Sequence, residues 1–371
     1  MDIETSVLQR YSEAARNRQD ALCCPVSYEA DLLRQLPAEI VEKDYGCGDP
    51  SRYVRAGDRV LDLGSGSGKI CYIAAQLVGE TGTVIGVDMN DDMLALARKY
   101  QAEMATVLGG DRVRFLKGWI HDLKLDLAAV DCYLAQHPVS TAADLVPLRQ
   151  WQEMQKAKQP LIPDSSVDLV ISNCVLNLVA DADKSQLVRE IWRVLKPGGR
   201  IAISDIVSDE PVPQPLKDDA ALWSGCIAGA FHEQEFLQAF AEAGFLAVAL
   251  DKWGEEPWQR VAGIEFRAVT VTAVKGSSEP CIDKGHAVIY RGPFAEVRDD
   301  ENHVYPRGER MAVSERTYRF LMQGPLRQVF IGIEPGNEVP PRPWCEPSGT
   351  RRPAAANKGA RHAAGEGGSC C

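Results

Sequence analysis

The feature that most constrains the fold is a regular alternation of strand-like and helix-like segments between residues 58 and 275. Short apolar runs predict buried strands, and longer amphipathic segments between them predict helices. The predicted strands are Arg59–Leu63, Thr83–Val87, Val113–Lys117, Val167–Ile171, Arg200–Ile206, Leu246–Leu250 and Phe266–Val274. The main predicted helices are Lys69–Val78, Asp91–Glu103, Lys184–Leu195 and His232–Ala243. This alternation predicts an α/β fold with a central, mostly parallel sheet covered by helices on both faces.

The segments on either side of this unit differ from it in character. We expect a helical N-terminal arm over residues 1–54 and the α/β domain over residues 55–275. Residues 276–333 hold short strand-like runs separated by turns, which predicts a small β-rich appendage. Residues 334–371 are rich in Pro, Gly and Ala, so we expect a disordered tail that ends in Cys370 and Cys371.

The charge balance excludes some classes of partner. The formal net charge is −11, which argues against a protein that binds nucleic acid or an anionic membrane through a basic surface. The N-terminal 20 residues are polar, and no apolar run is long enough to span a bilayer. We therefore expect a cytoplasmic protein that binds neither nucleic acid nor a membrane. We also expect a monomer.

Three glycines follow the first predicted strand, in the run Val60-Leu61-Asp62-Leu63-Gly64-Ser65-Gly66-Ser67-Gly68. Glycine allows a tight strand-to-helix turn and close approach of a ligand to the main chain. A dinucleotide site can look similar, but the spacing here is G-x-G-x-G, and Asp62 precedes it. The later segment Arg193–Ile203 adds a helix, a Pro-Gly-Gly turn and a strand. Together the two segments resemble class I methyltransferases with a Rossmann-like fold, which implies S-adenosylmethionine as cofactor.

Further cofactor contacts are expected at the ends of the next strands. Asp88, followed by Met89, lies about 20 residues beyond the glycines and is placed to bind ribose hydroxyls. The run Gly118-Trp119-Ile120 is expected to border the adenine, and Asn173 to face the methionine part. Two plainer interpretations stay open: Asp88 could cap the following helix, and Trp119 could be an ordinary core residue.

The chain has eleven cysteines, an odd and scattered set without any CxxC pair. This pattern supports neither a zinc ribbon nor a thioredoxin-like motif. Four of them, Cys47, Cys71, Cys174 and Cys226, fall where the fold would bring them to the cofactor. Cys71 is in the first turn of the helix after the glycines, whose positive end is expected to lower the thiol pKa. Convergence of soft thiolates predicts a soft, thiophilic ligand.

A single buried cysteine is more often a small hydrophobic residue than a ligand. We favour that interpretation for Cys132 and Cys281. Cys23 and Cys24, and also Cys370 and Cys371, are either auxiliary thiols that deliver the ligand or have no such role.

Several segments resemble arsenite methyltransferases closely. They are Asp44–Gly48, Asp62–Gly68 with Cys71-Tyr72, Val87-Asp88-Met89, Ser172–Leu178, Ser204-Asp205 and Trp223–Ala230. The resemblance implies that Cys71, Cys174 and Cys226 bind trivalent arsenic and that Cys47 supplies or exchanges a thiol in the redox steps. Thiol–disulfide exchange offers a source of electrons between rounds, with thioredoxin or glutathione as the external thiol that resets the pair. The chain departs from the family pattern at Lys69-Ile70, where Arg-Asp is common, and at His121, where an acid is common.

The resulting hypothesis is methyl transfer to arsenite, or to thiol-conjugated trivalent arsenic. The thiolates would direct the arsenic lone pair at the sulfonium methyl, and no general base is needed because no proton leaves the nucleophile. Two alternatives remain. One is a methyltransferase for another small acceptor, which would need a base or a desolvated carboxylate near the methyl. The other is a non-enzymatic thiol protein that senses or sequesters metalloids.

Overall fold

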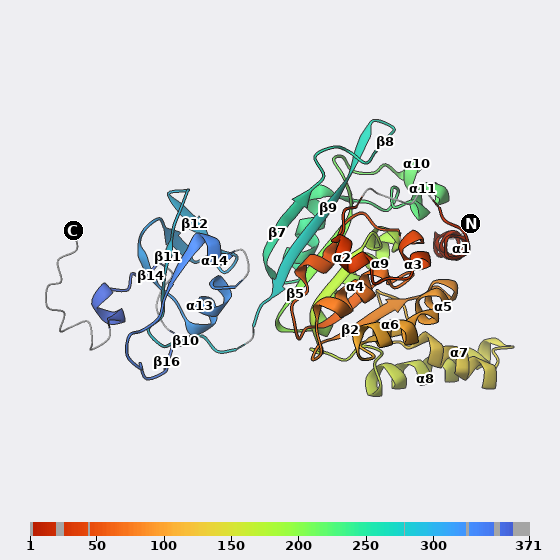
Figure 1. The fold of residues 1–371 in the computed structure, drawn as a ribbon, viewed down its shortest axis with the longest axis horizontal. Coiled ribbons are helices and arrows are strands. Elements are labelled where there is room, and N and C mark those ends of the chain that lie inside the picture. Colours follow the sequence, from red (N-terminus) through yellow and green to blue (C-terminus); the bar gives the residue numbers. More distant parts are fainter. Residues whose placement is uncertain are drawn as a thin grey trace. The chain divides into compact units, whose positions relative to one another are not determined.

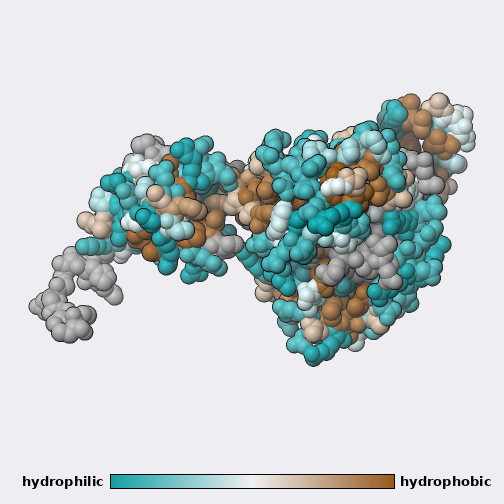
Figure 2. Space-filling model, turned by 90° about the horizontal axis from the view of Figure 1, so that it is seen from above, coloured by the Kyte–Doolittle hydropathy of each residue, from teal (hydrophilic) through white to brown (hydrophobic). Residues whose placement is uncertain are grey.

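The structure of the protein is a computed structural model that describes residues 3–19, 26–43, 45–277, 279–323, 326–344 and 349–358. It divides into two compact units, Met1–Gly276 and Ser277–Cys371 (Figure 1). On the face shown in Figure 2, hydrophilic side chains predominate and hydrophobic ones gather in separate patches. None of the described helices combines the length and the apolar character that crossing a bilayer requires.

The larger unit is built on one sheet with the strand order β3-β2-β1-β4-β5-β9-β7. Its strands are β1 (Arg59–Leu63), β2 (Thr83–Asp88), β3 (Val113–Lys117), β4 (Val167–Asn173), β5 (Leu195–Ser208), β7 (Phe245–Trp253) and β9 (Ile264–Lys275), with short β6 (Phe231–His232) and β8 (Gln259–Val261) beside β5 and β9. β1 to β5 pair in parallel, and β9 is antiparallel to both β5 and β7. β2 and β4 flank β1 on opposite sides, so the direction in which successive strands are added to the sheet reverses at β1. In open α/β sheets, ligands bind beyond the carboxyl ends of the strands at such a point.

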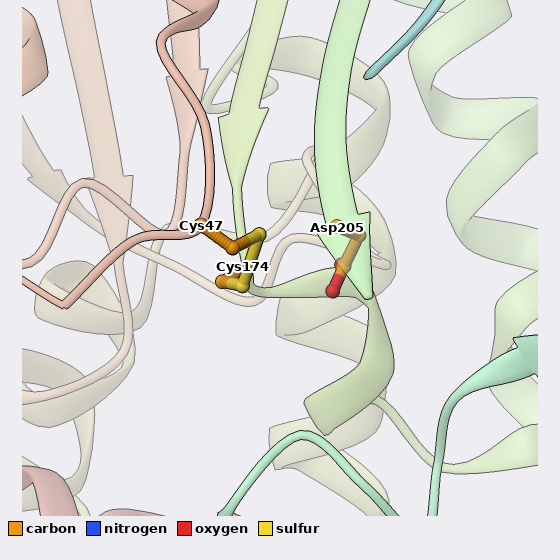
Figure 3. Close-up of side chains that lie close together, drawn as sticks. All are labelled: Cys47, Cys174 and Asp205. Carbon is orange, nitrogen blue, oxygen red and sulfur yellow. A yellow bond between two sulfur atoms is a disulfide. The ribbon is translucent and has the colours of Figure 1, made fainter. Parts of the chain in front are cut away.

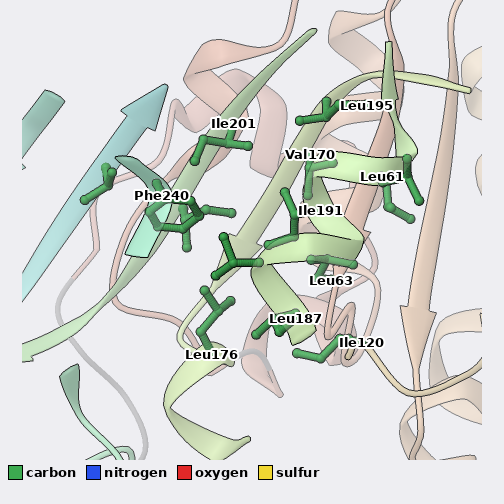
Figure 4. Close-up of a cluster of buried hydrophobic side chains, with 14 of the residues drawn as sticks. Leu61, Leu63, Ile120, Val170, Leu176, Leu187, Ile191, Leu195, Ile201 and Phe240 are labelled. Carbon is green, nitrogen blue, oxygen red and sulfur yellow. The ribbon is translucent and has the colours of Figure 1, made fainter. Parts of the chain in front are cut away.

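Helices cover both faces of this sheet. They are α4 (Lys69–Leu77), α5 (Asp91–Lys99) and α6 (Gln101–Leu108) on one face, and α9 (Asp181–Val194) and α12 (Glu233–Glu242) on the other. Side chains alternate between the faces along each strand: Leu61 and Leu63 belong to the same buried cluster as Ile191 and Phe240 (Figure 4), whereas Val60 packs on the α4 side. Each fully buried side chain of this size contributes roughly 1.5–3 kcal/mol relative to its exposed state. The predicted fold class is confirmed.

The remaining helices lie in connections and in the N-terminal segment. They are α1 (Ile3–Arg16), α2 (Ala30–Leu33), α3 (Ala38–Glu42), η2 (Pro50–Tyr53), α7 (Leu127–Gln136), η3 (Ala142–Asp144), α8 (Leu145–Lys158), η4 (Leu176–Leu178), α10 (Gln214–Lys217) and α11 (Ala220–Ser224). The N-terminal segment belongs to the same compact unit as the sheet, because Ala14 and Ile40 are fully buried in it.

The smaller unit has its own core of Val288, Tyr305, Met311, Leu321 and Phe330, with other residues around them. Its elements are β10 (Ile282–Asp283), β11 (Ala287–Tyr290), β12 (Glu296–Arg298), β13 (Val304–Pro306), β14 (Arg310–Ala312), α13 (Glu315–Leu321), α14 (Leu326–Val329), β15 (Phe330–Ile333), β16 (Arg342–Pro343) and η5 (Ala354–Asn357). β11 lies between β14 and β15, and all pairings in this unit's sheets are antiparallel.

Residues 334–371 were predicted to form a disordered tail, but the described part of this segment is packed onto the smaller unit. β16 pairs with β10, Arg352 forms an ion pair with the buried Asp283 at 2.8 Å, and the amide of Asn357 donates to the carbonyl oxygen of Gly285 at 2.6 Å. Pro- and Gly-rich composition suggested disorder, but polar side chains of this segment satisfy buried groups of the unit. Cys370 and Cys371 lie outside the described residues.

Candidate active site

The turn from β1 into α4 depends on glycine. Gly64 has φ +70°, and a Cβ there would lie 2.4 Å from a methyl carbon of Val175. Gly68, with φ +85°, is the N-cap of α4 and packs against Phe115, so it supports the loop without lining the cavity. The backbone can therefore approach a ligand closely at this turn.

A cavity of about 1090 Å³, including its open mouth, lies at the carboxyl edge of β1, β2 and β4. The predicted cofactor-binding residues that line it are Asp62, Gly64, Ser65, Gly66, Asp88, Met89, Gly118, Trp119, Ile120 and Asn173. Among the described residues, the buried hydroxyl of Ser65 has no hydrogen-bond partner. This hydroxyl is directed away from the cavity, toward the space beside Gly86 and the Cys71 sulfur. The fit to S-adenosylmethionine rests on other residues. A Cβ at Gly66 would meet nothing within 4 Å, so a ligand can lie against the backbone there, and the polar side chains of Asp62, Asp88 and Asn173 in the lining can bind its hydroxyls and amino-acid group.

Asp88 stands at the end of β2 as predicted. Its carboxylate accepts hydrogen bonds from the backbone N–H groups of Gly66 and Asn90, each at 2.8 Å. Burial raises the pKa of Asp88, and these backbone donors oppose that rise. The capping role belongs to Asn90, whose side chain accepts from the N–H of Met93 at 3.1 Å. Asp88 therefore faces the cavity rather than capping α5.

Trp119 is half-buried and stands on the cavity wall, outside the hydrophobic clusters. Its ring stacks on that of His121, with centroids 5.8 Å apart and an interplanar angle of 16°. Gly118 is buried beside them, and a Cβ there would lie 2.4 Å from Leu161. This wall offers a flat aromatic surface of the kind on which an adenine ring stacks.

Asn173 has a role that sequence reasoning did not give it. Its side-chain oxygen accepts from the N–H groups of Cys47 and Gly48 at 2.9 and 3.0 Å, and its nitrogen donates to the carbonyl of Gly48 at 2.8 Å. A Cβ on Gly46 would lie 2.2 Å from that nitrogen. Asn173 thus fastens the Cys47 loop to the end of β4, in addition to lining the cavity.

Three of the four predicted thiol residues come together. Cys47, Cys174 and Cys226 are buried in one cluster with apolar neighbours that include Ile206 and Phe266. Cys47 and Cys174 form a disulfide at the end of β4 (Figure 3). The thiol of Cys226 contacts the carbonyl oxygen of Cys174 at 3.4 Å. Cys174 and Cys226 have φ values of +60° and +62°, unusual for residues with a side chain, and such strain is typical of functional sites.

Cys71 does not join them, which corrects the prediction. Its side chain is fully buried in the other cluster, under the α4 face, and its thiol donates to Asp62 at 3.2 Å. Burial raises the pKa of the Cys71 thiol well above its ordinary value, and the Asp62 carboxylate raises it further. The direction is opposite to the lowering expected from the helix terminus, because burial and the neighbouring anion both disfavour the thiolate.

Asp205, near the carboxyl end of β5, is a functional candidate that sequence reasoning named only within a matching segment. Its fully buried carboxylate lies within 4.8 Å of the sulfur atoms of Cys47 and Cys174 (Figure 3). It accepts from the N–H groups of Leu176, Asn177 and Ile206 at 2.8–3.3 Å. Burial raises the pKa of Asp205 to about 7 despite these donors. The carboxylate organises the turn that follows Cys174.

The segment that carries Cys226 is held by Lys184, which sequence reasoning missed. The buried ammonium of Lys184, on α9, donates to Asp181 and to the carbonyl of Gly229, and lies 4.4 Å from the ring centre of Phe231. Gly229 in turn packs against the turn after Cys174: a Cβ there would lie 2.0 Å from the carbonyl oxygen of Asn177. A lysine at a helix start gives no local sign of such a contact.

The N-terminal helix α1 also contributes to the site. Glu4, Val7, Leu8 and Tyr11 line the cavity, and the Tyr11 hydroxyl lies 3.9 Å from the sulfur of Cys226. Burial, more than the neighbouring Cys226, raises the pKa of Tyr11. Nothing local in the sequence of α1 predicted this placement.

The other cysteines lie elsewhere. Cys132 is exposed, so the packed interpretation is wrong for it, and Cys281 is half-buried. Cys23 and Cys24 lie outside the described residues, as does Asp44 of the predicted motif.

Comparison with known families divides the chain much as the structure does. A family described as a methyltransferase domain matches residues 55–157 and 148–244. A second, described as a domain of unknown function (DUF8838), matches residues 277–362.

Individual relatives match over most of the chain. The arsenite methyltransferase of Aquipseudomonas alcaligenes is 31% identical over 338 residues, which cover 85% of this chain and 86% of that protein. The arsenite methyltransferase of Homo sapiens is 28% identical over 93% of this chain and 86% of its own length. Among solved structures, an arsenic(III) S-adenosylmethionine methyltransferase from Chlamydomonas reinhardtii is 28% identical with a TM-score of 0.57, and the match covers 87% of this chain and all of that one.

Proposed function

The chain belongs to the arsenite methyltransferase family, and from this premise we propose that it transfers methyl groups from S-adenosylmethionine to trivalent arsenic held by cysteine thiolates. It is an S-adenosylmethionine-dependent methyltransferase with the class I fold. The bound cofactor supplies an activated methyl group on a sulfonium sulfur. The chain's own task is to bind the acceptor beside the cavity and to fix its orientation.

One observation carries the acceptor assignment: the clustering of Cys47, Cys174 and Cys226, with Cys174 also on the cavity wall. Thiolates bind soft, thiophilic centres, and trivalent arsenic is one. Each bond forms by exchange, in which a thiol proton and an arsenic-bound hydroxide leave together as water. We propose Cys174 and Cys226 as the principal ligands, with Cys47 as a third thiolate or as the disulfide partner of Cys174. Cys71 drops out of the ligand set because it is buried against Asp62.

The disulfide between Cys47 and Cys174 makes the proposal redox-dependent. Two electrons and two protons from an external dithiol, or from two monothiols, convert it to two thiols and leave the reductant as a disulfide. Thioredoxin or glutathione has this chemistry. We therefore propose that the protein acts in the cytoplasm, where such reductants are present, and that it contributes to arsenic detoxification. We also propose that it acts as a monomer.

One observation favours a second candidate, methylation of another small acceptor. That reaction needs a base or desolvated carboxylate near the methyl, and Asp205 is a buried carboxylate beside the thiols. Its oxygens, however, accept from three backbone N–H groups that hold the turn after Cys174. This arrangement supports a structural task for Asp205 and so favours arsenic.

The test is transfer of labelled methyl from S-adenosylmethionine to arsenite in the presence of a reducing dithiol. Wild type is compared with Cys174→Ser and Cys226→Ser, and with Cys132→Ser as the matched control, since Cys132 is exposed and outside the cluster. We expect labelled methylarsenic from wild type and the control, and loss of more than 100-fold in the other two. If wild type binds the cofactor but labels no arsenic, or if both cluster variants stay active, the acceptor assignment is wrong. A non-enzymatic sequestering protein would bind arsenite as wild type without labelling it.

A further inference from the structure

Helix α1 connects the cofactor side of the cavity to the acceptor side. The side-chain amide of Asn90, in the turn after β2, donates to the carbonyl of Leu8 at 3.1 Å. Arg10 donates to the carbonyl of Ala221 at 2.9 Å, on α11, which leads into Cys226. These contacts on both sides position α1 along the cavity, so a side chain that it directs inward is held in place.

Tyr11 is such a side chain. Its hydroxyl lies 3.9 Å from the sulfur of Cys226, a hydrogen-bonding distance for this large atom. Its ring and that of Tyr45 form a T-shaped pair with centroids 6.4 Å apart. The same sulfur lies 3.4 Å from the carbonyl oxygen of Cys174. The sulfur of Cys226 therefore lies between the carbonyl oxygen of Cys174, which can only accept a hydrogen bond, and the hydroxyl of Tyr11 on α1.

The two contacts suit different protonation states of the Cys226 sulfur, the thiol and the thiolate. A carbonyl oxygen can only accept, so its contact requires the proton of the Cys226 thiol. When the thiol exchanges onto arsenic, that proton leaves with the displaced hydroxide as water, and the carbonyl contact is lost. The hydroxyl of Tyr11 can still donate, because a metalloid-bound thiolate retains lone pairs.

We propose that Tyr11 is a positioning residue of the acceptor site, whose hydroxyl donates a hydrogen bond to the Cys226 sulfur once that sulfur is a thiolate. The part of the inference that concerns arsenic rests on the proposed function. The part that concerns the thiolate rests only on the contact between the two side chains.

The experiment uses the full-length, reduced protein and Tyr11→Phe, which removes the hydroxyl and keeps the ring. The matched control is Tyr45→Phe, because the Tyr45 hydroxyl also holds α1 but through backbone groups, donating to Ala14 and accepting from Gln19. Alkylation of Cys226 by iodoacetamide is followed against pH by mass spectrometry of its peptide. Cofactor affinity and the kcat and KM for arsenite are measured beside it.

For Tyr11→Phe we expect the pH midpoint of Cys226 alkylation to rise by about one pH unit, because the thiolate loses a donor. We expect kcat for arsenite to fall roughly tenfold, as for loss of one hydrogen bond to a charged group, with cofactor affinity within about twofold of wild type. In Tyr45→Phe the alkylation midpoint should stay at the wild-type value.

An unchanged midpoint in Tyr11→Phe, or an equal change in both variants, would overturn the inference, since the hydroxyl would then act only through packing of α1. The midpoint is measured without arsenic. If wild type fails to methylate arsenite, the proposed function fails, while the alkylation result still decides whether Tyr11 supports the Cys226 thiolate.

Discussion

The thiol of Cys71 donates a hydrogen bond to the carboxylate of Asp62 at 3.2 Å, behind the wall of the cofactor cavity. A Cβ on Gly86 would lie 2.8 Å from that sulfur, so the thiol fills a space left by a glycine on β2. The family resemblance implies that Cys71 is an arsenic ligand, whereas in the structure its thiol is hydrogen-bonded to Asp62, just before the glycine loop. This relationship leads to the first prediction.

Replacing Cys71 with Ala should weaken cofactor binding about fivefold, because Asp62 loses a buried donor worth about 1 kcal/mol. Calorimetric titration with S-adenosylmethionine measures the effect. The number of arsenic atoms bound per reduced chain should not change, and Cys132→Ala should change neither quantity. If Cys71→Ala binds fewer arsenic atoms per chain but binds the cofactor normally, Cys71 is an arsenic ligand after all.

Ser65→Ala should weaken neither the folded protein nor cofactor binding. The Ser65 hydroxyl has no partner among the described residues, so its removal should leave the free energy of unfolding of the ligand-free protein unchanged or raise it by about 1 kcal/mol. Cofactor affinity should stay within about twofold of wild type, since this hydroxyl points behind the loop, toward Gly86, and not into the cavity. A substantial loss of stability in the ligand-free variant would mean that the hydroxyl has a structural task.

Lys184→Met should loosen the segment that carries Cys226. The carbonyl of Gly229 loses its donor, and the free energy of unfolding should fall by roughly 2 kcal/mol. Methylation should fall at least tenfold. Lys217→Met is the control, because Lys217 shares the partner Asp181 but makes its ion pair at the surface. Equal effects of the two variants would place the cause at Asp181 rather than at Gly229.

Gly229→Ala should abolish activity through sterics alone. The added methyl carbon would lie 2.0 Å from the carbonyl oxygen of Asn177, so the segments that carry Cys174 and Cys226 must separate. Gly110→Ala is the control, since a Cβ at Gly110 meets nothing within 4 Å. Arsenic binding by the reduced protein reports the separation, and normal binding by Gly229→Ala would contradict the close contact.

Asp205 should make stability depend on pH. Its pKa rises from an ordinary 3.8 to about 7, which corresponds to an order of 4 kcal/mol. Because the folded state holds this proton more tightly, the associated stability is fully present below about pH 4 and is lost as pH rises through about 7. Urea unfolding from pH 4 to pH 8 should show this loss in wild type and a smaller loss in Asp205→Asn. Parallel pH profiles would exclude Asp205 as the source.

Local rules explain why the sequence was sufficient for the cofactor half of the site. Glycine spacing at a strand-to-helix turn, an acid at the end of the next strand and the alternation of apolar runs all act within about 20 residues. These local features are enough to predict that Asp62, Gly64, Ser65 and Asp88 meet at the cofactor, and all four line the cavity.

The acceptor half required the tertiary structure, because its members are far apart in the chain. Tyr11, Cys47, Cys174 and Cys226 come from four separate segments, and no periodicity relates one to another. Proximity in sequence was misleading for Cys71: it is three residues from the glycine loop, but its side chain packs in the core on the α4 side, in a different cluster from Cys47, Cys174 and Cys226. The sequence by itself determined the fold class, the cofactor loop and the kind of chemistry. Only packing decided which thiols meet, because the direction of each side chain depends on long-range contacts between β4, β5, α1 and the segment after α11.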